Sequence, residues 1–199
     1  MTLLTLVRHG QTDWNLARRI QGATDIPLND TGRDDARRAA AELSGGYHHR
    51  VWASPLSRAH ETAQIIAQSL GLAEPELHAG LRERTFGEAE GIPVEEYIEK
   101  YSTWHTTVPG SETFDEVTDR ALTALEEISR ESRRRAAPVA ESLIVVAHGG
   151  VIRALLEHAS GGSLPAEGQR ILNGSLHRFV MDPDGLRCIH SYDAQSVDA

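Results

Sequence analysis

Two histidines in this sequence stand beside glycines at the ends of apolar runs, and both could act on an anionic ligand. Arg8-His9-Gly10 follows the run Leu3 to Val7, and His148-Gly149-Gly150 follows the run Ser142 to Val146. Glycine lets backbone N–H groups approach a ligand closely, and a helix N-terminus favours anions. A histidine in such a place could be a nucleophile, a proton carrier or an anion contact. The two segments are therefore the first candidates for a functional site.

The elements that must position these histidines are predicted from apolar periodicity and capping residues. Short apolar runs predict strands at Leu3 to Val7, Arg50 to Ala53, Ser142 to Val146, Leu176 to Met181 and Leu186 to Tyr192. Five helices are predicted. The first is capped by Thr31 and runs to Leu43, and the second is capped by Ser54-Pro55 and ends at Leu70. The others are Val94 to Tyr101, Glu112 to Arg134, and a helix that His148-Gly149-Gly150 opens and that runs to Ala159.

Strands that alternate with helices predict an α/β fold, with three layers (α/β/α) around a mostly parallel central sheet. Ligands bind such sheets where strands end and helices begin, which selects the same two histidine segments. The chain of 199 residues is interpreted as a single domain, residues 1–199, with a short cap segment at about 87–110.

The composition is that of a soluble globular protein with an acidic surface: 40% of residues are apolar, 25% are charged, and the net charge is −9. This charge argues against nucleic acid or a membrane as the main partner, although a few cations in a cleft can still attract an anionic substrate. The sequence shows neither a signal-peptide pattern nor an apolar run long enough to cross a membrane. Cys188 is the single cysteine, so no internal disulfide can form, and we expect a cytoplasmic protein.

Five segments resemble the motifs of one enzyme family. The stretch Leu6 to Asn15, LVRHGQTDWN, resembles the signature of the histidine phosphatase superfamily, also called phosphoglycerate mutase-like. Four more segments follow in the family's order: Arg19 to Leu28, Ser54 to Ala63, Leu81 to Gly91 and Val146 to Gly150. One such motif is weak, but five in order are highly specific, and together they extend over about residues 3–180.

The resemblance implies catalytic roles for five residues. His9 resembles the nucleophile that forms a phosphohistidine, and Glu83 resembles the general acid that later acts as a base. His148 resembles the second family histidine, which binds the transferring phosphoryl group and acts best when protonated. Arg8 and Arg58 resemble the phosphate clamps, since guanidinium groups match phosphate oxygens in geometry and charge.

Further substrate contacts are implied for Asn15, Gln21, Gly22 and the backbone N–H of Gly149. Arg58 has support that is independent of the resemblance. It falls in the first turn of its predicted helix, where a cation opposes the helix dipole, and a bound anion would remove that conflict.

The short cap segment resembles that of the small bacterial phosphatases in this superfamily. A phosphatase acting on small phosphomonoesters is therefore the favoured function, and the alternatives are a phosphoglycerate mutase and a non-catalytic binder of phosphorylated ligands. Candidate aromatic contacts to the organic part of the substrate are Phe86, Tyr97, Tyr101 and Trp104. Ala89 stands where many small phosphatases have tryptophan, with an effect on the pocket that the sequence does not define.

No metal or other cofactor is expected, because the implied stabilisers of negative charge are arginines and a histidine. The expected partner is a small-molecule phosphomonoester, and the chain is expected to act as a monomer or homodimer. The basic run Arg130 to Arg135 lies at the end of a predicted helix and is interpreted as a solvated face. Cys188 is interpreted as a core residue.

Overall fold

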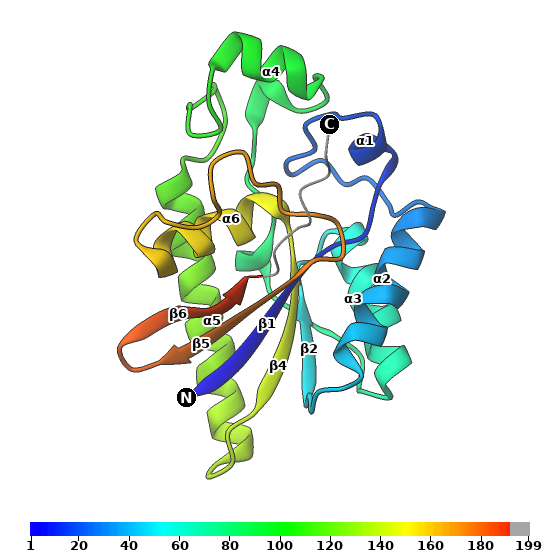
Figure 1. The fold of residues 1–199 in the computed structure, drawn as a ribbon, viewed down its shortest axis with the longest axis vertical. Coiled ribbons are helices and arrows are strands. Elements are labelled where there is room, and N and C mark those ends of the chain that lie inside the picture. The colour runs from blue at the N-terminus through cyan, green and yellow to red at the C-terminus, as the bar shows by residue number, and fades with distance from the viewer. Residues whose placement is uncertain (192–199) are drawn as a thin grey trace.

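A six-stranded mixed sheet with helices on both faces forms the body of the protein (Figure 1), in a computed structural model that describes residues 1–191. The strands are β1 (Thr2–Arg8), β2 (Arg50–Ala53), β3 (Glu76–Leu77), β4 (Ser142–Ala147), β5 (Leu176–Asp182) and β6 (Gly185–Ser191). Their order in the sheet is β3-β2-β4-β1-β5-β6. The first four in this order are parallel to one another, whereas β5 is antiparallel to both of its neighbours, β1 and β6. The predicted α/β fold with a mostly parallel sheet is confirmed.

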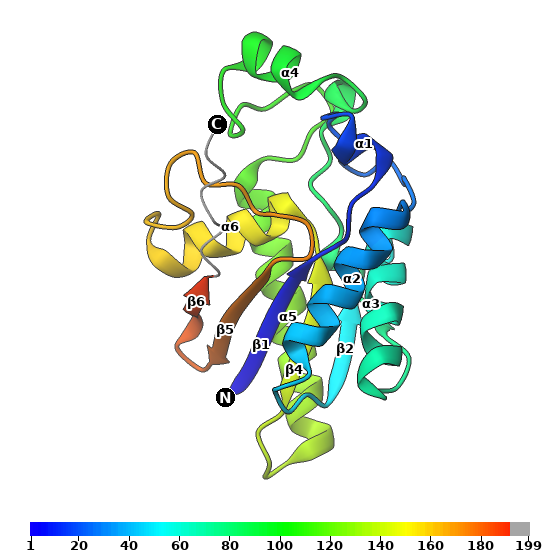
Figure 2. The ribbon, with the colours of Figure 1, turned by 45° about the vertical axis from the view of Figure 1, so that its right-hand side comes forward.

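The helices are α1 (Asp13–Leu16), α2 (Asp30–Leu43), α3 (Ser57–Leu70), α4 (Val94–Tyr101), α5 (Phe114–Ala136) and α6 (Gly149–Ser160). Single turns of 3₁₀ helix occupy Ala79–Leu81 and Gly87–Ala89. Helices α2 and α3 cover one face of the sheet, and α5 and α6 cover the other (Figure 2).

The alternation of side chains along β4 shows how the sheet holds these layers together. Ile144 and Val146 pack into the apolar cluster that contains α2 and α3. Leu143 and Val145 pack into the cluster that contains α5 and α6. A strand whose both faces are buried reads as a continuous apolar run, which is why the sequence predicted it clearly.

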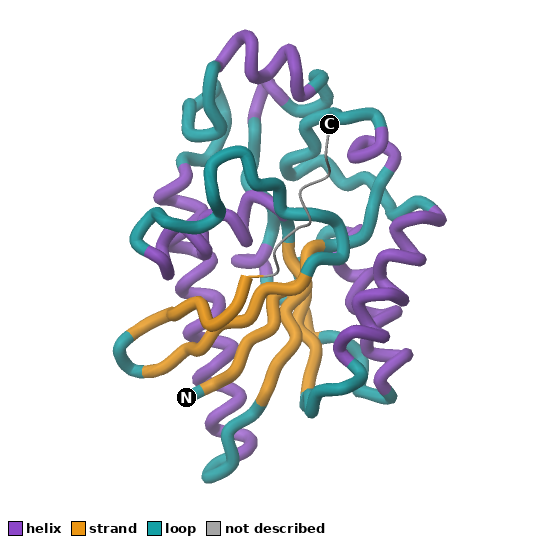
Figure 3. Tube along the Cα trace, viewed as in Figure 1, coloured by secondary structure: helices purple, strands orange, loops and turns teal. Residues whose placement is uncertain are grey.

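The carboxyl ends of the parallel strands point toward α4 and several loops, which lie beyond that end of the sheet (Figure 3). Segment 87–110, which includes α4, has its own small apolar cluster around Phe86, Ala89, Tyr97 and Val108. These residues pack on one another and on Ile20 rather than on the sheet core. The cap segment is therefore built as a separate layer over the strand ends.

Two predicted helix caps are wrong, and both have a physical reason. Helix α2 begins at Asp30, and its N-cap is Asn29, whose side chain accepts from Gly32 N at 2.9 Å; the cap is not Thr31. Helix α3 begins at Ser57 after Leu56, not at Ser54-Pro55. The Ser54 hydroxyl bonds to His148 instead, and Asp25, distant in sequence, accepts from Ser57 N at 2.9 Å.

Other boundaries differ less. Helix α5 begins at Phe114 behind a Thr113 capping box, two residues later than predicted. Helix α1 and strand β3 were not predicted, because four and two residues are too short to show periodicity. The final predicted strand extended to Tyr192, which lies outside the described residues.

Candidate active site

A cavity of about 390 Å³ opens beside the carboxyl end of β1, between the sheet and the cap segment. It is lined by eight of the predicted site residues: Arg8, His9, Asn15, Gln21, Gly22, Arg58, Glu83 and Gly149. The remaining one, His148, lies directly behind His9, with the two ring centroids 5.1 Å apart. The fold thus brings together residues from five separate sequence segments.

The His9 side chain is held in one orientation and one protonation state. Its Nδ1 lies 2.7 Å from the Gly10 carbonyl oxygen, which can only accept, so Nδ1 carries the proton. Burial lowers the pKa of His9 well below 6.5, and the cations Arg58 and Arg8 lower it further. The ring is therefore neutral at pH 7, and Nε2 has a free lone pair. Such an imidazole can attack an electrophile.

Two arginines, Arg58 and Arg8, lie close enough to His9 to act on its charge. Arg58 is fully buried in the first turn of α3, as predicted, and donates to the carbonyls of Gly22 at 2.8 Å and Thr24 at 2.9 Å. Arg8 donates to the carbonyl of Ile171 at 2.5 Å. Burial lowers the pKa of Arg8 to about 10, with Glu83 opposing the shift, so the guanidinium remains charged at neutral pH. The two cations are fixed before any ligand arrives.

His148 is the N-cap residue of α6 and is completely buried. Its Nε2 lies 2.8 Å from the Ser54 hydroxyl oxygen. Burial, followed by the charge of Arg58, lowers the pKa of His148 well below 6.5, so the ring is neutral in this structure. The expected protonated state would therefore require an anion beside the ring, because a nearby negative charge raises the pKa of a histidine.

Three buried nitrogens in this cluster have no hydrogen-bond partner among the described residues. They are Arg8 Nε, Arg58 Nε and His148 Nδ1. Buried polar atoms in proteins are nearly always paired, so three unpaired nitrogens around one side chain call for a ligand. Two of the three belong to cations, and an anion with several oxygen atoms suits them.

The amide side chains of Asn15 and Gln21 are oriented by Thr12. The Gln21 Oε1 atom accepts from the Thr12 hydroxyl at 3.0 Å, and Asn15 Oδ1 accepts from Thr12 N at 3.1 Å. Because both amide oxygens accept from Thr12, the NH₂ groups are left as the donors. Thr12 also forms the capping box of α1 with Asn15, which explains why so short a helix occurs here.

Glu83 reaches the cavity from the loop that precedes the cap. Its carboxylate accepts from Arg84 N at 2.9 Å and from Gly150 N at 3.1 Å. A Cβ atom at position 150 would stand 2.6 Å from Glu83 Oε1, so only glycine allows this approach. The second glycine after His148 thus serves the position of Glu83.

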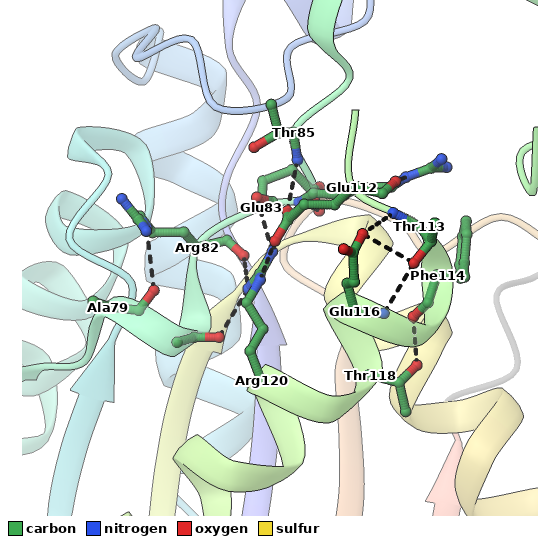
Figure 4. A network of polar contacts seen from close by, with 12 residues as sticks. Ala79, Arg82, Glu83, Thr85, Glu112, Thr113, Phe114, Glu116, Thr118 and Arg120 are labelled. Carbon is green, nitrogen blue, oxygen red and sulfur yellow. Dashed lines mark hydrogen bonds and ion pairs between the residues drawn. The ribbon is translucent and has the colours of Figure 1, made fainter. Parts of the chain in front are cut away.

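Arg120 of α5 holds the backbone of the Glu83 loop (Figure 4). Its guanidinium donates to the carbonyls of Gly80, Arg82 and Glu83 at 2.9, 2.7 and 3.1 Å. The same group pairs with Glu112, at 2.7 Å from Nε to Oε1. Glu112 Oε2 in turn accepts from Thr85 N at 2.9 Å. This network fixes the backbone of the Glu83 loop to α5.

The structure separates the four candidate aromatic contacts. Phe86 and Trp104 line the cavity, but Tyr97 and Tyr101 do not. Tyr97 is buried and stacks on Trp104, with centroids 5.2 Å apart. Ala89 is buried in the cap cluster and also lies away from the cavity lining.

Sequence reasoning missed several residues that line the cavity. They are four arginines and five apolar side chains: Arg18, Arg19, Arg153, Arg170, Ile20, Val94, Ile98, Phe114 and Ile171. Arg153 could have been found from its place one turn along the helix after His148, on the same face as Gly149 and Gly150. Arg170 lies in an irregular loop, where no periodic signal indicates a direction.

Other parts of the chain carry simpler features. Within residues 1–191, no three histidine, cysteine or acidic side chains are placed together as metal ligands. The same residues include no helix long and apolar enough to cross a membrane. Arg135 of the basic run pairs with Glu76 and Glu131. Cys188 packs against the core cluster on the α5 and α6 face.

Two proteins of known sequence are similar to this chain over most of its length. The chain is 39% identical over 196 residues to the uncharacterized phosphatase PhoE of Bacillus subtilis, covering 98% of this chain and 96% of PhoE. It is 39% identical over 187 residues to phosphoglycerate mutase-like protein 4 of Arabidopsis thaliana, covering 88% and 78% of the two chains.

Among solved structures, the chain is similar to a mycobacterial glucosyl-3-phosphoglycerate phosphatase in complex with VO3. The TM-score is 0.80 at 25% identity, over 94% of this chain and 96% of the other. Residues 4–194, nearly the whole chain, match the family described as histidine phosphatase superfamily (branch 1). The chain belongs to the histidine phosphatase superfamily.

Proposed function

We propose that this protein is a phosphatase that hydrolyses small-molecule phosphomonoesters through a phosphohistidine on His9. The observation that carries the proposal is the state of His9: a neutral ring, held by Gly10, with the cations Arg58 and Arg8 nearby. The three unpaired nitrogens of Arg8, Arg58 and His148 suit the oxygens of a phosphoryl group at the same place.

In the first step, Nε2 of His9 attacks phosphorus and the bond from phosphorus to the ester oxygen breaks. Glu83 donates its proton to the leaving oxygen, which departs as an alcohol. Arg8 and Arg58 stabilise the charge that spreads over the phosphoryl oxygens in the transition state. Asn15, Gln21, Gly22 and the Gly149 N–H complete the binding of that group. His148 takes up a proton from solvent when the anion binds beside it and returns that proton when inorganic phosphate leaves.

In the second step, water attacks the phosphohistidine and the bond between nitrogen and phosphorus breaks. Glu83, now a carboxylate, takes the proton from water. Inorganic phosphate leaves and His9 returns to its neutral state. Glu83 therefore ends the cycle protonated, as it began it. The side chains around the cavity and one water molecule supply every group that the reaction needs.

The size of the cavity supports a small substrate. About 390 Å³ lies at the lower end of the range for small-molecule sites, and segment 87–110 acts as the cap over it. The relative PhoE and the mycobacterial structure are both named phosphatases, in agreement with this reaction. We place the enzyme in the cytoplasm because its single cysteine leaves no internal disulfide.

Phosphoglycerate mutase activity is the second candidate, because one relative is named as mutase-like. With 3-phosphoglycerate and a trace of 2,3-bisphosphoglycerate, we expect release of inorganic phosphate and little 2-phosphoglycerate. A mutase must shield its phosphohistidine from water, and a short cap favours access of water instead. Phosphate release and isomer formation should be measured in the same samples. Fast interconversion of the isomers without phosphate release would reverse the assignment, and no turnover of any phosphomonoester would favour a binding protein.

Chelation should leave the activity intact. The groups proposed to stabilise negative charge are Arg8, Arg58 and His148, so hydrolysis needs no divalent ion. We expect p-nitrophenyl phosphate turnover to change less than about two-fold after dialysis against EDTA, well below the 10²-fold or larger loss typical when a catalytic group is removed. Activity lost in EDTA and restored by added magnesium, manganese or zinc would contradict this mechanism.

A further inference from the structure

The cavity holds more positive charge than one phosphoryl group requires. Arg8 and Arg58 lie at His9 and account for the proposed phosphate contacts. Two more arginines, Arg153 on α6 and Arg170 in the loop between α6 and β5, also line the cavity. Arg153 is half-buried and Arg170 is exposed, and like charges that line one cavity repel one another unless an anion lies between them.

The loop that carries Arg170 is held at two points on either side of it. The Gln169 carbonyl accepts from Arg153 at 2.8 Å, and the Ile171 carbonyl accepts from Arg8 at 2.5 Å. This loop crosses the carboxyl end of β1 in both ribbon views (Figures 1 and 2). The backbone at Arg170 is therefore anchored to the phosphate end of the cavity through Arg8 and to α6 through Arg153.

Arg170 differs from the other arginines at the rim, because it has no compensating partner among the described residues. Arg18 pairs with Glu95 at 2.8 Å, and Arg19 donates to the Gly91 carbonyl at 2.7 Å. Arg170 makes no hydrogen bond or ion pair with the residues that the structure describes, and its charge lowers the pKa of Arg8. Arg153 donates to the Gln169 carbonyl and lies 3.9 Å from Glu157, at the limit of an ion pair.

We infer that Arg170, supported by Arg153, binds a second anionic group on the substrate. The preferred substrates are then small phosphomonoesters that carry a carboxylate or a second phosphate in addition to the phosphate that His9 attacks. Ile171 and Phe114 also line the cavity and can contact the carbon atoms between the two anionic ends. This inference rests on the proposed phosphatase activity and narrows its substrate class.

Matched substrates isolate the second anion. 3-Phosphoglycerate carries a carboxylate where glycerol 3-phosphate carries a neutral hydroxymethyl group. Fructose 1,6-bisphosphate carries a second phosphate that fructose 6-phosphate lacks. In Arg170→Gln, we expect kcat/KM to fall about 10- to 100-fold for 3-phosphoglycerate, for fructose 1,6-bisphosphate or for both. A loss of this size is typical when a hydrogen bond to a charged group is removed. For glycerol 3-phosphate, fructose 6-phosphate and p-nitrophenyl phosphate, kcat/KM should change less than about three-fold. Arg170→Lys should recover part of the loss, because lysine restores the positive charge without the paired N–H donors of a guanidinium. Arg130→Gln, an exposed position on α5, is the matched control.

Binding gives a measurement that does not depend on turnover. In a His9→Ala background, titration calorimetry should show tighter binding of 3-phosphoglycerate or the bisphosphate than of its neutral-ended partner. Adding Arg170→Gln should remove that difference. Equal losses for all substrates, or no preference for a second anion in either measurement, would overturn the inference. Failure of the phosphatase proposal is recognised separately, as absence of p-nitrophenyl phosphate hydrolysis by the unsubstituted enzyme.

Discussion

His9→Ala is expected to lose nearly all turnover while keeping the fold. The alanine removes the only atom proposed to attack phosphorus, and loss of a nucleophile in a hydrolase costs on the order of 10⁶-fold in kcat. His9 is buried, but its ring lines the cavity and makes one hydrogen bond, to the neighbouring Gly10 carbonyl, so we expect the variant to fold. Steady-state phosphate release measures the first effect, and thermal unfolding measures the second.

A trapping experiment identifies the bond itself. Brief incubation of the unsubstituted enzyme with ³²P-labelled substrate, followed by denaturation, should leave an acid-labile, base-stable phosphoryl group on the peptide that contains His9. His158→Ala, an exposed histidine in the last turn of α6, is the control and should retain both label and activity. Label on a serine peptide, or full activity in His9→Ala, is incompatible with the proposed nucleophile.

Glu83→Gln is expected to harm poor leaving groups far more than good ones. An alkyl phosphate leaves as a strongly basic alkoxide and needs a proton, whereas nitrophenolate leaves almost unaided. Glutamine keeps the size of the side chain but has no proton to transfer. General acid–base help is worth about 10²–10⁴-fold, so kcat/KM for an alkyl phosphate should fall by that range, with a much smaller fall for p-nitrophenyl phosphate.

The choice of kinetic constant decides whether this comparison is informative. Glu83 is also proposed to activate water in the second step, which both substrates share, so steady-state kcat could fall equally for both. The comparison therefore belongs in kcat/KM or in a pre-steady-state burst, which report the phosphorylation of His9. Glu88→Gln is the matched control, because Glu88 is close in sequence but does not line the cavity.

An equal loss for both substrates would make Glu83 a positioning residue, and the acid would have to be sought elsewhere. Glu90 is then a poor replacement. Its carboxylate accepts from Ala23 N, Thr24 N, the Thr24 hydroxyl and Phe86 N, and it does not line the cavity. His148 would be the better candidate, since it already contacts the ring of His9.

The sequence by itself determined the fold class and the residues around His9. The strand Ser142 to Val146 is a run of buried apolar residues, and Gly71 ends α3 in the left-handed conformation. Both signals are local, because burial on two faces and a helix end each act through a few neighbouring residues. The five family motifs then selected eight residues that line one cavity, as well as His148 behind it.

The tertiary structure alone decided which groups engage those residues. Asp25 replaces Ser54 at the start of α3, Gly150 makes room for Glu83, and Arg120 holds the Glu83 loop from another helix. Each of these contacts joins segments far apart in the chain, so no local pattern can report it.

The protonation states and the outer cations were decided in the same way. The pKa of His148 is lowered by burial and by Arg58, which no spacing in the sequence measures. Arg170 lines the cavity because the loop after α6 folds back over β1, where Arg8 and Arg153 donate to its carbonyls. Desolvation and charge proximity depend on the packed arrangement of the whole chain, and so the second anion subsite could be inferred only after folding placed these side chains together.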